Sequence, residues 1–507
     1  MSAPQSVLRG GLLPEPLIFE RSAPGRTGSV VDPGAVGGPT VDAVIPEALR
    51  REDDLEGLPE VGELDVVRHF TRLSQWNLSA ATTLYPLGSC TMKYNPLMNE
   101  ALARLPGFAN LHPLSPDEWA QGTLELMARL ADFLREVSGL PGVTLQPAAG
   151  AHGELTGMKM IRAYHVDRGD PRRRVVIPAS AHGTNPASAA LCGYQVTEVP
   201  ANDAGMLELE TVRAVLDRDV AALMVTNPNT LGVFERNIAA IADAVHEVGG
   251  LVYCDGANMN ALMGVAKPGD MGADVLQFNL HKTFSTPHGG GGPGAGPVAV
   301  SARLEEYLPI PRLVRDDAGW RWSEEFPRAI GRVRSFHGNV AMLVRAYCYI
   351  RALGGDGLTD ATAKAVLNAN YVRARLARIL PLAFPTPSLH ECVFSDRDLE
   401  ATGVRTLDVA KRLLDYGFYA PTIYFPLVVP GALMIEPTET ESRQTLDEFV
   451  AALEAIVAEA RQTPDVVKSA PHATFVGRLD ETRAARRPVL RWRRSSEERP
   501  RPPRQDG

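Results

Sequence analysis

Cysteine is scarce in this chain, and the few present are widely separated. Among 507 residues there are five, at Cys90, Cys192, Cys254, Cys348 and Cys392. They are too few and too scattered for a disulfide framework, and no CxxC pair suggests a metal site. We therefore expect a reducing, cytoplasmic setting and no bound metal.

Long apolar runs are also missing. No stretch of about 18 apolar residues could form a transmembrane helix. The N-terminal segment has leucines, but Gly and Pro interrupt them, so the continuous apolar core of a signal peptide is absent. We expect no membrane partner.

Positive charge is limited and unevenly distributed. The chain has 52 Lys and Arg against 60 Asp and Glu, a net charge of −8. Residues 478–507 hold ten arginines and five acidic residues, a local charge of +5, so the rest carries −13. An acidic body argues against a nucleic-acid partner, because phosphate binding needs a basic face. The tail itself has few apolar residues, and we expect it to be disordered and solvated.

The remaining composition is that of a globular protein. A hydrophobic content of 45% excludes wholesale disorder, and the length fits two to four domains or one large enzyme domain with appendages. The composition shifts predict four segments: an extended N-terminal arm (1–63), a large α/β domain (64–335), a smaller α+β domain (336–465) and a basic tail (466–507).

Between residues 143 and 300 the sequence alternates between short apolar strands and helical stretches. Strands such as RVVIPAS, AALMVTNP, LVYCDGA and DVLQFNLH are separated by helices such as IAAIADAVHEVGG. This alternation predicts a mostly parallel sheet covered on both faces. Ligands of such sheets bind at the carboxyl ends of the strands. The loops after Ser180, Pro228, Asp255 and Asn279 are therefore expected around one site.

Lys282 follows one of these strands and precedes four consecutive glycines, Gly289 to Gly292. A lone lysine is most often simply solvated. However, a partly apolar pocket with cationic neighbours such as His281 and His288 would lower the pKa of the amine and make it nucleophilic. The glycines would let the backbone pass close to a planar ligand. An aldehyde cofactor linked as a Schiff base fits this pattern.

Asp255 ends an apolar strand 27 residues before Lys282. One interpretation is that it caps the following turn. The other is that it pairs with the ring nitrogen of a pyridinium cofactor, which keeps that nitrogen protonated. The small side chain of Ala257 would let such a ring lie flat.

Three further strand ends carry weaker signals. Gly150 and Ala151 open a helix whose free N–H groups suit a phosphate, although the GxGxxG spacing of a dinucleotide site is missing. His182 either stacks on a flat ring or is an ordinary loop histidine, with Thr184, Asn185 and Ser188 nearby as polar partners. Thr226 and Asn227 precede Pro228, where a simple turn is the alternative.

In this order the signals resemble the large domain of a fold-type I pyridoxal-phosphate enzyme. Six motifs are more specific, and they resemble the P-protein family of the glycine cleavage system, glycine dehydrogenase (decarboxylating). They are LYPLGSCTMKYNP, QPAAGAHGELTGMK, SAHGTNPASAA, TNPNTLGVFE, CDGANMNALMG and NLHKTFSTPHGGGGPG. The resemblance spans residues 64–437. Because the chain has about half the length of the single-chain form, it resembles subunit 2 of the two-subunit form.

The resemblance assigns roles to individual residues. It implies that Lys282 holds pyridoxal phosphate as a Schiff base, that Asp255 pairs with the pyridine nitrogen, and that His182 stacks on the ring. Thr226 and Asn227 would lie near the phenolic oxygen of the ring.

The same resemblance places the phosphate and the ring surroundings. Gly150 and Ala151 would bind the phosphate, together with Ser180 or Thr184. Ala257 and His281 complete the expected cofactor site, with Lys282 and His182 as the catalytic residues.

The implied reaction is decarboxylation of glycine, followed by transfer of the aminomethyl group to the lipoyl cofactor of the H-protein. The implied partner is P-protein subunit 1, in an α2β2 heterotetramer. Two alternatives remain open: another fold-type I enzyme acting on amino acids, such as a decarboxylase or lyase, or a non-catalytic subunit of the same complex. The presence of Lys282 disfavours the second.

Two further groups of polar residues have two interpretations each. Tyr85, Ser89, Cys90 and Lys93 lie in the first motif and would suit carboxylate or thiol handling, or would simply order a loop. Arg334 and His337 either meet the substrate carboxylate or form structural contacts, which we consider the better interpretation.

Overall fold

The computed structural model describes residues 15–26, 28, 41–50, 58–112, 114–288 and 294–490. The predicted glycine loop 289–292, the end of the basic tail (491–507) and much of the N-terminal arm lie outside these residues. The chain divides into two compact units. The first comprises residues 1–78, 414–417 and 470–507, and the second comprises residues 79–413 and 418–469.

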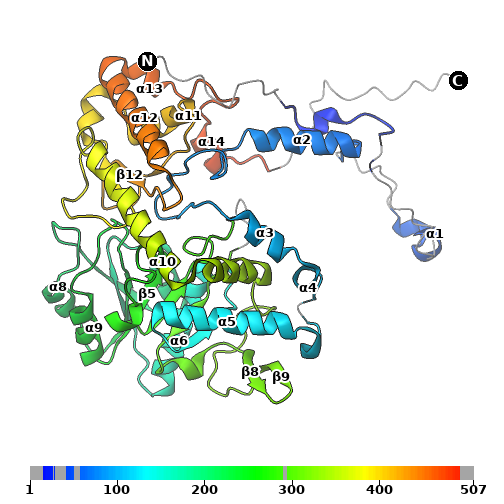
Figure 1. The fold of residues 1–507 in the computed structure, drawn as a ribbon, viewed down its shortest axis with the longest axis vertical. Coiled ribbons are helices and arrows are strands. Elements are labelled where there is room, and N and C mark those ends of the chain that lie inside the picture. Colours follow the sequence, from blue (N-terminus) through cyan, green and yellow to red (C-terminus); the bar gives the residue numbers. More distant parts are fainter. Residues whose placement is uncertain are drawn as a thin grey trace. The chain divides into compact units, whose positions relative to one another are not determined.

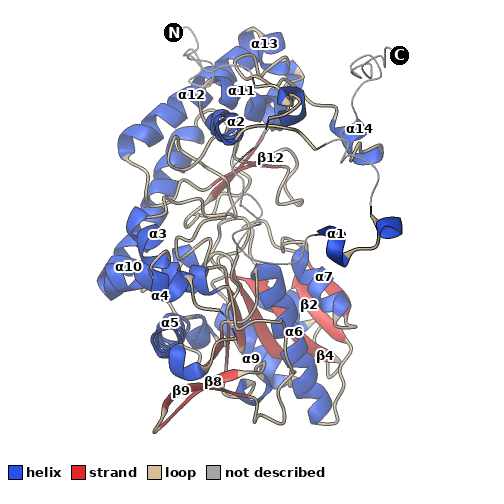
Figure 2. Ribbon diagram, turned by 90° about the vertical axis from the view of Figure 1, so that its right-hand side faces the viewer, coloured by secondary structure: helices blue, strands red, loops and turns tan. Residues whose placement is uncertain are grey.

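A seven-stranded sheet forms the centre of the second unit (Figures 1 and 2), in the order β1-β7-β6-β5-β4-β2-β3. Strands β2 to β6 pair in parallel, whereas β7 runs antiparallel to both β1 and β6. The mostly parallel α/β sheet predicted from the sequence is therefore confirmed. The strands are β1 (Gly142–Thr144), β2 (Arg174–Pro178), β3 (Gln195–Val199), β4 (Val220–Thr226), β5 (Leu251–Gly256), β6 (Val275–Phe278) and β7 (Val298–Val300).

Alternate residues of these strands enter two different cores, so both faces of the sheet are covered. On one face Val175 and Ile177 of β2 pack with Ile161 of α6. On the other face Val176 packs with Ile241 of α9. Every residue of β4 and β5 is buried, which is why these strands read as continuous apolar runs. The covering helices are α5 (Gln121–Ser138), α6 (Gly150–Asp167), α7 (Thr184–Leu191), α8 (Leu209–Arg213) and α9 (Ile238–Glu247).

The C-terminal part of the second unit combines helices with a small antiparallel sheet, β10-β12-β11. The 37-residue α10 is two helices joined at Gly354, whose φ of 64° breaks the helical geometry. This segment mixes helices and strands, and most of it lies in the same compact unit as the large sheet. Its elements are α10 (Val340–Leu376), β10 (Cys392–Ser395), α11 (Thr406–Asp415), β11 (Thr422–Ile423), β12 (Ala432–Ile435), α12 (Arg443–Gln462) and α13 (Pro464–Lys468).

Shorter elements complete the second unit. The hairpin of β8 (Arg312–Asp316) and β9 (Gly319–Ser323) follows the large sheet in sequence. The others are α3 (Leu97–Ala103), α4 (Pro106–Ala109), η4 (Asp117–Trp119), η5 (Met259–Ala261), η6 (Pro268–Met271), η7 (Glu305–Tyr307) and η8 (Arg397–Thr402).

The first unit contains one long helix, α2 (Glu63–Gln75), and short helical segments. The buried carboxylate of Glu15 holds this helix through His69 at 2.8 Å and Arg72 at 3.1 Å. The sequence assigned residues 64–78 to the large domain, but they cluster with the arm. The short elements are η1 (Ile18–Arg21), α1 (Val41–Val44), η3 (Glu47–Leu49) and α14 (Glu481–Arg486).

The prediction of a disordered tail from residue 466 is wrong for two helices. α13 begins at Pro464 and buries Val467, which anchors it in the second unit. α14 is capped by the Asp480 carboxylate, which accepts a hydrogen bond from the backbone N–H of Arg483. Composition alone did not reveal these local signals.

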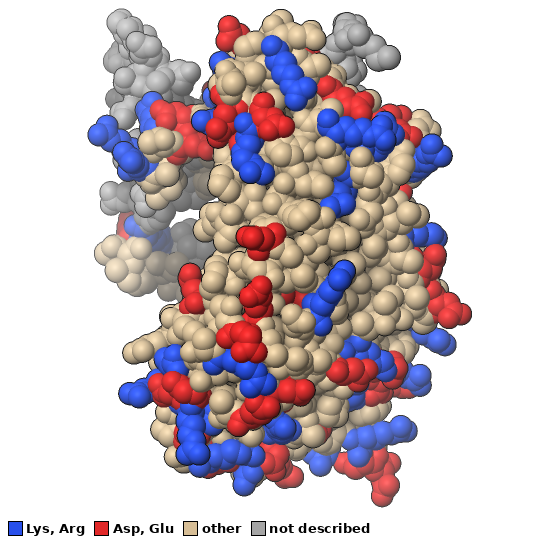
Figure 3. Space-filling model, turned by 90° about the vertical axis from the view of Figure 1, so that its left-hand side faces the viewer, with Lys and Arg blue, Asp and Glu red and all other residues tan. Residues whose placement is uncertain are grey.

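The surface agrees with the acidic composition. On the face in Figure 3, Lys and Arg side chains are interspersed with Asp and Glu, and the described atoms of that face form no continuous basic patch. Among the described residues, no helix is both long and apolar enough to cross a membrane.

The packing of α12 generates a stability prediction. Leu453 is fully buried, whereas Leu367 on α10 is 66% exposed. We expect Leu453→Ala to lower the free energy of unfolding by about 2–5 kcal/mol, because it removes buried apolar contacts and leaves a cavity. Leu367→Ala is the control and should change it by less than about 1 kcal/mol. Denaturant unfolding measures both, and equal losses in the two variants would contradict this packing.

Candidate active site

A pocket of about 240 Å³ lies at the carboxyl ends of β4, β5 and β6 and at the start of α6. This is where the strand-end rule predicted a site. The residues predicted to contact the cofactor line this pocket, apart from Asn227 and Ser180, the latter predicted as an alternative to Thr184. The lining residues are Ser89, Ala149, Gly150, Ala151, Glu154, His182, Thr184, Thr226, Thr230, Asp255, Ala257, Asn258, Gln277, Asn279, His281 and Lys282.

The start of α6 lines the pocket with residues that have small side chains or none, Ala149, Gly150 and Ala151. A Cβ at Gly150 would lie 2.1 Å from Asn279 Oδ1, and a Cβ at Gly296 would lie 2.0 Å from the carbonyl oxygen of Ala149. Glycine is therefore required at both positions. The first-turn N–H groups of α6 and the positive end of its dipole favour a phosphate group there.

Asp255 is buried at the end of β5 and fixed on one side. Its Oδ1 accepts hydrogen bonds from Gln277 Nε2 at 2.5 Å and from the backbone N–H of Ala257 at 2.9 Å. The amide nitrogen of Asn185, in the orientation that satisfies its surroundings, lies 3.2 Å from Asp255 Oδ2. The same nitrogen lies 2.7 Å from Glu154 Oε2, so Asn185 bridges two carboxyl groups.

Glu154 is the second carboxyl of this group, and only 4% of it is exposed. Burial, together with the neighbouring Asp255 carboxylate, raises the pKa of Glu154 from 4.5 to about 9. The charge of Lys282 acts in the opposite direction. Without a bound cation at this end of the pocket, Glu154 therefore holds a proton at neutral pH.

His182 also lines the pocket, as a neutral ring. Its Nδ1 faces the hydroxyl of Thr184 at 2.9 Å and accepts from the Thr184 backbone N–H at 3.2 Å. Burial lowers the pKa of His182, and the nearby Lys282 lowers it further. Thr184 thus orients His182, in addition to lining the pocket.

His281 and His288, the two histidines near Lys282 in the sequence, do not carry the positive charge that was expected of them. The pKa of His281 is lowered to about 3. Burial is the largest cause, and the electrostatic influence of His288 and Lys282 adds to it. Burial also lowers the pKa of His288, whose ring meets that of His281 edge to face at 5.1 Å. Both rings are therefore neutral at physiological pH and do not supply the positive charge that was predicted beside Lys282.

Thr226 and Asn227 have different positions, although one role was predicted for both. The Thr226 hydroxyl lines the pocket and has no hydrogen-bond partner among the described residues. Asn227 does not line the pocket, because its Oδ1 accepts from the backbone N–H of Glu235 at 3.0 Å. This position favours the interpretation of Asn227 as part of a simple turn.

The first motif contributes one residue to the pocket wall, Ser89. Lys93 instead has a structural role, since it is buried and pairs with Glu439 at 2.6 Å and Asn260 at 2.6 Å. Tyr85 stacks on Tyr419 with ring centroids 3.8 Å apart. Burial raises the pKa of the Cys90 thiol, and Lys282 partly offsets this.

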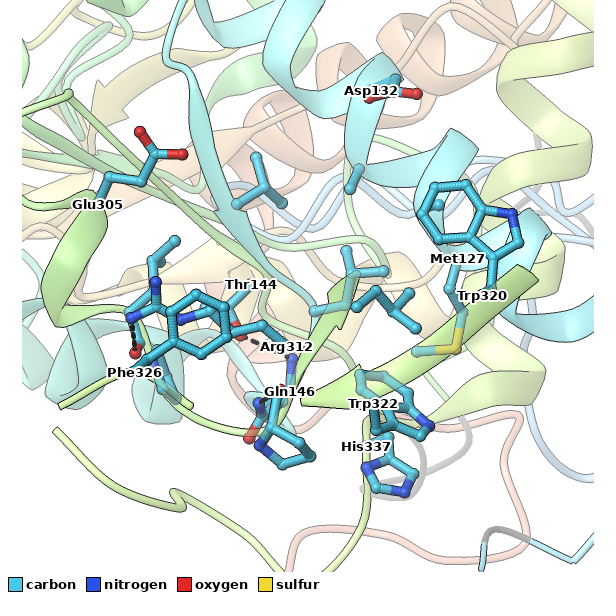
Figure 4. Close-up of a pocket in the computed structure, with 18 of the residues that line it drawn as sticks. Met127, Asp132, Thr144, Gln146, Glu305, Arg312, Trp320, Trp322, Phe326 and His337 are labelled. Atoms are coloured by element: carbon cyan, nitrogen blue, oxygen red, sulfur yellow. Dashed lines mark hydrogen bonds between the residues drawn. The ribbon is translucent and has the colours of Figure 1, made fainter. Parts of the chain in front are cut away.

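A second cavity, of about 270 Å³, lies elsewhere, beside the β8-β9 hairpin (Figure 4). Trp320, Trp322 and Phe326 line it, and His337 stacks on Trp322 at 4.1 Å. Arg334 donates to the carbonyl oxygen of Gln146 at 3.4 Å. Neither Arg334 nor His337 lines the Lys282 pocket, which favours the structural interpretation of both.

Six residues of the pocket wall were not predicted from the sequence: Ala149, Glu154, Thr230, Asn258, Gln277 and Asn279. Gln277 and Asn279 interrupt the apolar strand DVLQFNLH at its carboxyl end, and this polar interruption was the available signal. Thr230 lies beyond β4 and donates to the carbonyl oxygen of Ser180, a long-range contact without a local signal.

Two family models match the chain. Residues 38–319 match the glycine cleavage system P-protein, and residues 361–474 match the C-terminal domain of glycine dehydrogenase. A protein of Chlorobium chlorochromatii named probable glycine dehydrogenase (decarboxylating) subunit 2 is 55% identical over 473 residues, which cover 93% of this chain and 98% of that protein. A Bacillus licheniformis protein with the same name is 54% identical over 477 residues, covering 94% and 98%.

Solved structures share the fold at lower identity. A glycine decarboxylase (P-protein) of the glycine cleavage system, in inhibitor-bound form, aligns with a TM-score of 0.69 at 22% identity, covering 83% of this chain and 96% of that one. An aspartate aminotransferase from Thermus thermophilus aligns with a TM-score of 0.56 at 16% identity, covering 75% and 99%. These neighbours confirm the predicted fold-type I architecture.

The raised pKa of Glu154 predicts a pH-dependent stability. In the unfolded chain this carboxyl loses its proton near pH 4.5, whereas in the folded chain it keeps the proton to about pH 9, so folding becomes less favourable as pH rises between these values. Glu154→Gln removes this penalty. Relative to wild type, the cofactor-free variant should gain roughly 1.4 kcal/mol of unfolding free energy per pH unit at most, or about 2–3 kcal/mol between pH 6 and pH 8.

Denaturant unfolding at the two pH values measures this difference. Glu448→Gln, which changes an exposed carboxyl on α12, is the matched control and should show no such trend. A constant difference between Glu154→Gln and wild type from pH 6 to pH 8 would mean that Glu154 is not protonated in the folded chain.

Proposed function

The chain belongs to the glycine cleavage system P-protein family, and on that premise we propose that it decarboxylates glycine with the help of pyridoxal phosphate. The aminomethyl group that remains is transferred to the lipoyl cofactor of the H-protein. The observation that carries this proposal is the pocket itself. It gathers Lys282, Asp255, His182 and Gly150 from four separate segments at the carboxyl edge of the sheet.

Pyridoxal phosphate fits the groups that line this pocket. Gly150 and Ala151 line the pocket at the start of α6, where the N–H groups of the first helical turn suit its phosphate. The hydroxyl of Thr226 and Oε1 of Gln277 are buried polar atoms without hydrogen-bond partners among the described residues, as expected where a polar ligand completes the site. The Asp255 and Glu154 carboxyls suit a protonated ring nitrogen.

The residues would act as follows. Lys282 would bind the cofactor covalently through its amine and release it when the amino group of glycine takes its place. Asp255, held by Gln277 and Ala257, would keep the proton on the ring nitrogen. His182, neutral and oriented by Thr184, would cover one face of the ring and exclude water from it. When bound, the cofactor supplies an electron sink for the bond that breaks at the substrate α-carbon.

Glu154 adds to this arrangement. In the empty pocket it is a protonated acid, and a cationic ring nitrogen nearby would favour its ionised form. Asn185 can donate to both carboxyls in either state, so it would hold their spacing while the proton leaves. We therefore propose that Glu154 supports Asp255 in holding the pyridine ring.

The relatives' names also support a partner. Proteins named subunit 2 belong to an enzyme of more than one subunit, and we propose that this chain assembles with P-protein subunit 1 in an α2β2 heterotetramer. Lipoylated H-protein would be the acceptor and glycine the substrate. The cytoplasmic location inferred from the cysteines stays a prediction.

The role of Lys282 generates a direct prediction. With pyridoxal phosphate added, the wild-type chain should show an absorption band at the edge of the visible region that borohydride removes. We expect Lys282→Ala to lose this covalent band and to lose activity by about 10³-fold or more, because no other amine occupies its place. Lys364→Ala, an exposed lysine paired with Asp360 on α10, is the control and should keep both. A Lys282→Ala variant with the band and full activity would refute the assignment.

The reaction itself separates this proposal from other fold-type I chemistry. We expect exchange of labelled bicarbonate into the glycine carboxyl to require lipoylated H-protein, and to rise when subunit 1 is co-purified with the chain. Strong exchange or decarboxylation with amino acids other than glycine would favour a different amino-acid decarboxylase or lyase. A chain that shows the absorption band but no exchange in the full mixture would contradict the proposed reaction.

A further inference from the structure

Two glutamates lie fully buried just outside the Lys282 pocket, and no role has been given to them above. Glu391 directly precedes β10, and Glu436 directly follows β12, so each lies at the end of an apolar strand. Both have 0% exposure. Among the described residues, one basic side chain lies within ion-pair distance of these carboxyls. It is His390, whose Nε2 lies 3.9 Å from Glu436 Oε1.

Residues of the motif LYPLGSCTMKYNP donate hydrogen bonds to both carboxyls, and Glu436 accepts more of them than Glu391 does. Glu436 accepts from both groups of Thr91, the backbone N–H at 3.0 Å and the hydroxyl at 2.5 Å. Glu391 accepts from the backbone N–H of Ser89 at 2.8 Å, and its other oxygen lies 3.5 Å from Asn258 Nδ2. The two hydrogen bonds from Thr91 engage both oxygens of Glu436, and donation to both oxygens stabilises an ionised carboxylate.

The same contacts tie the glutamates to the pocket. Ser89 and Asn258, the partners of Glu391, line the pocket together with Lys282. Ser89 and Thr91 have left-handed backbones, with φ of 64° and 39°, which is costly for residues other than glycine. The two glutamates therefore hold a strained turn against the pocket wall.

The charge state of the pair follows from its burial. One Glu391 oxygen, one Glu436 oxygen and one His390 nitrogen lie within 4.8 Å of one another. When two neighbouring carboxyl groups are buried, ionising both costs much more free energy than ionising one. Burial, together with Glu436, raises the pKa of Glu391 well above its usual value. Burial raises the pKa of Glu436 only to about 7, because Thr91 donates two hydrogen bonds to it.

The other titratable groups around the pair do not neutralise it. Burial lowers the pKa of His390 to about 3, so its ring is neutral. Lys93 acts on Glu436 from a distance, but its own ion pair at 2.6 Å is with Glu439. Burial raises the pKa of the Cys90 thiol, which keeps it uncharged. Lys282 lines the same pocket as Ser89 and Asn258, the hydrogen-bond partners of Glu391, and its positive charge favours the ionised form of both carboxyls.

We propose that Glu391 keeps its proton while Glu436 carries a single negative charge, and that this charge is the counter-ion of the nitrogen of Lys282 when the cofactor is bound. The proposal rests on the function proposed above, because it concerns Lys282 as the cofactor lysine. Glu436 would be a positioning residue that acts through the strained turn and through space. Its charge would keep the Lys282 nitrogen in the cationic form, which is the form that an incoming amine attacks.

The test is a pH titration of the absorption of the bound cofactor in three variants. Glu436→Gln keeps an acceptor for Thr91 but removes the charge, and it should lower the pKa of the Lys282-linked chromophore by about one unit, because it removes a neighbouring opposite charge. Glu391→Gln resembles the protonated acid and should leave that pKa unchanged. Glu441→Gln is the matched control, since it changes a half-buried carboxyl whose pKa is shifted by burial alone.

Three results would overturn the proposal. They are no shift in Glu436→Gln, an equal shift in Glu391→Gln, and a stoichiometric metal ion found by elemental analysis, since a metal would make the pair a coordination site. Infrared spectroscopy gives a second measurement on the wild-type chain. At pH 8 the difference spectrum between the wild type and Glu391→Gln should contain the band of a protonated buried carboxyl, whereas the difference spectrum between the wild type and Glu436→Gln should not. The band of protonated Glu154 is common to all three chains and cancels in both differences.

These experiments also separate the two proposals. A chain that forms no chromophore with pyridoxal phosphate contradicts the proposed function, whereas the infrared band still tests the protonation of Glu391. A normal chromophore with an unchanged titration in Glu436→Gln contradicts the counter-ion alone.

Discussion

The parallel register of three neighbouring strands determines the site. Thr226 at the end of β4 pairs with Asp255 of β5, and Asp255 pairs with Gln277 of β6. These three polar residues therefore lie side by side where otherwise apolar strands end. A shift of one residue in either pairing would turn a side chain to the opposite face and remove the Gln277 contact that fixes Asp255. The covered, apolar faces of the sheet keep this register in place.

The second constraint is the concentration of buried acid around one lysine. Asp255 and Glu154 lie on one side of the pocket, and Glu391 and Glu436 lie behind its wall. Each pair reduces its charge in the same way, with one carboxyl held by donated hydrogen bonds and the other raised in pKa by burial. This arrangement keeps negative charge ready for a cationic ligand while limiting the cost of burying it.

The sequence predicted the parts of this architecture that depend on local pattern. Continuous apolar runs revealed β4 and β5, and the residues that follow such runs revealed Asp255, Lys282 and His182. What it missed depends on contacts between distant segments. The neutral state of His281 follows from its burial in the fold, Asn227 turns toward Glu235, and Glu391 meets Ser89 across 302 residues of sequence. The composition of the tail also gave no indication of α14, because the local signal for this helix is a single N-cap residue, Asp480.

The central claim is that this pocket holds pyridoxal phosphate on Lys282. Borohydride reduction of the wild-type chain with the cofactor bound, followed by proteolysis and peptide mass mapping, tests it most directly. The account predicts a single reduced adduct, on the peptide that contains Lys282. An adduct on another lysine, Lys93 included, would contradict it, as would a reduced chain that carries no adduct.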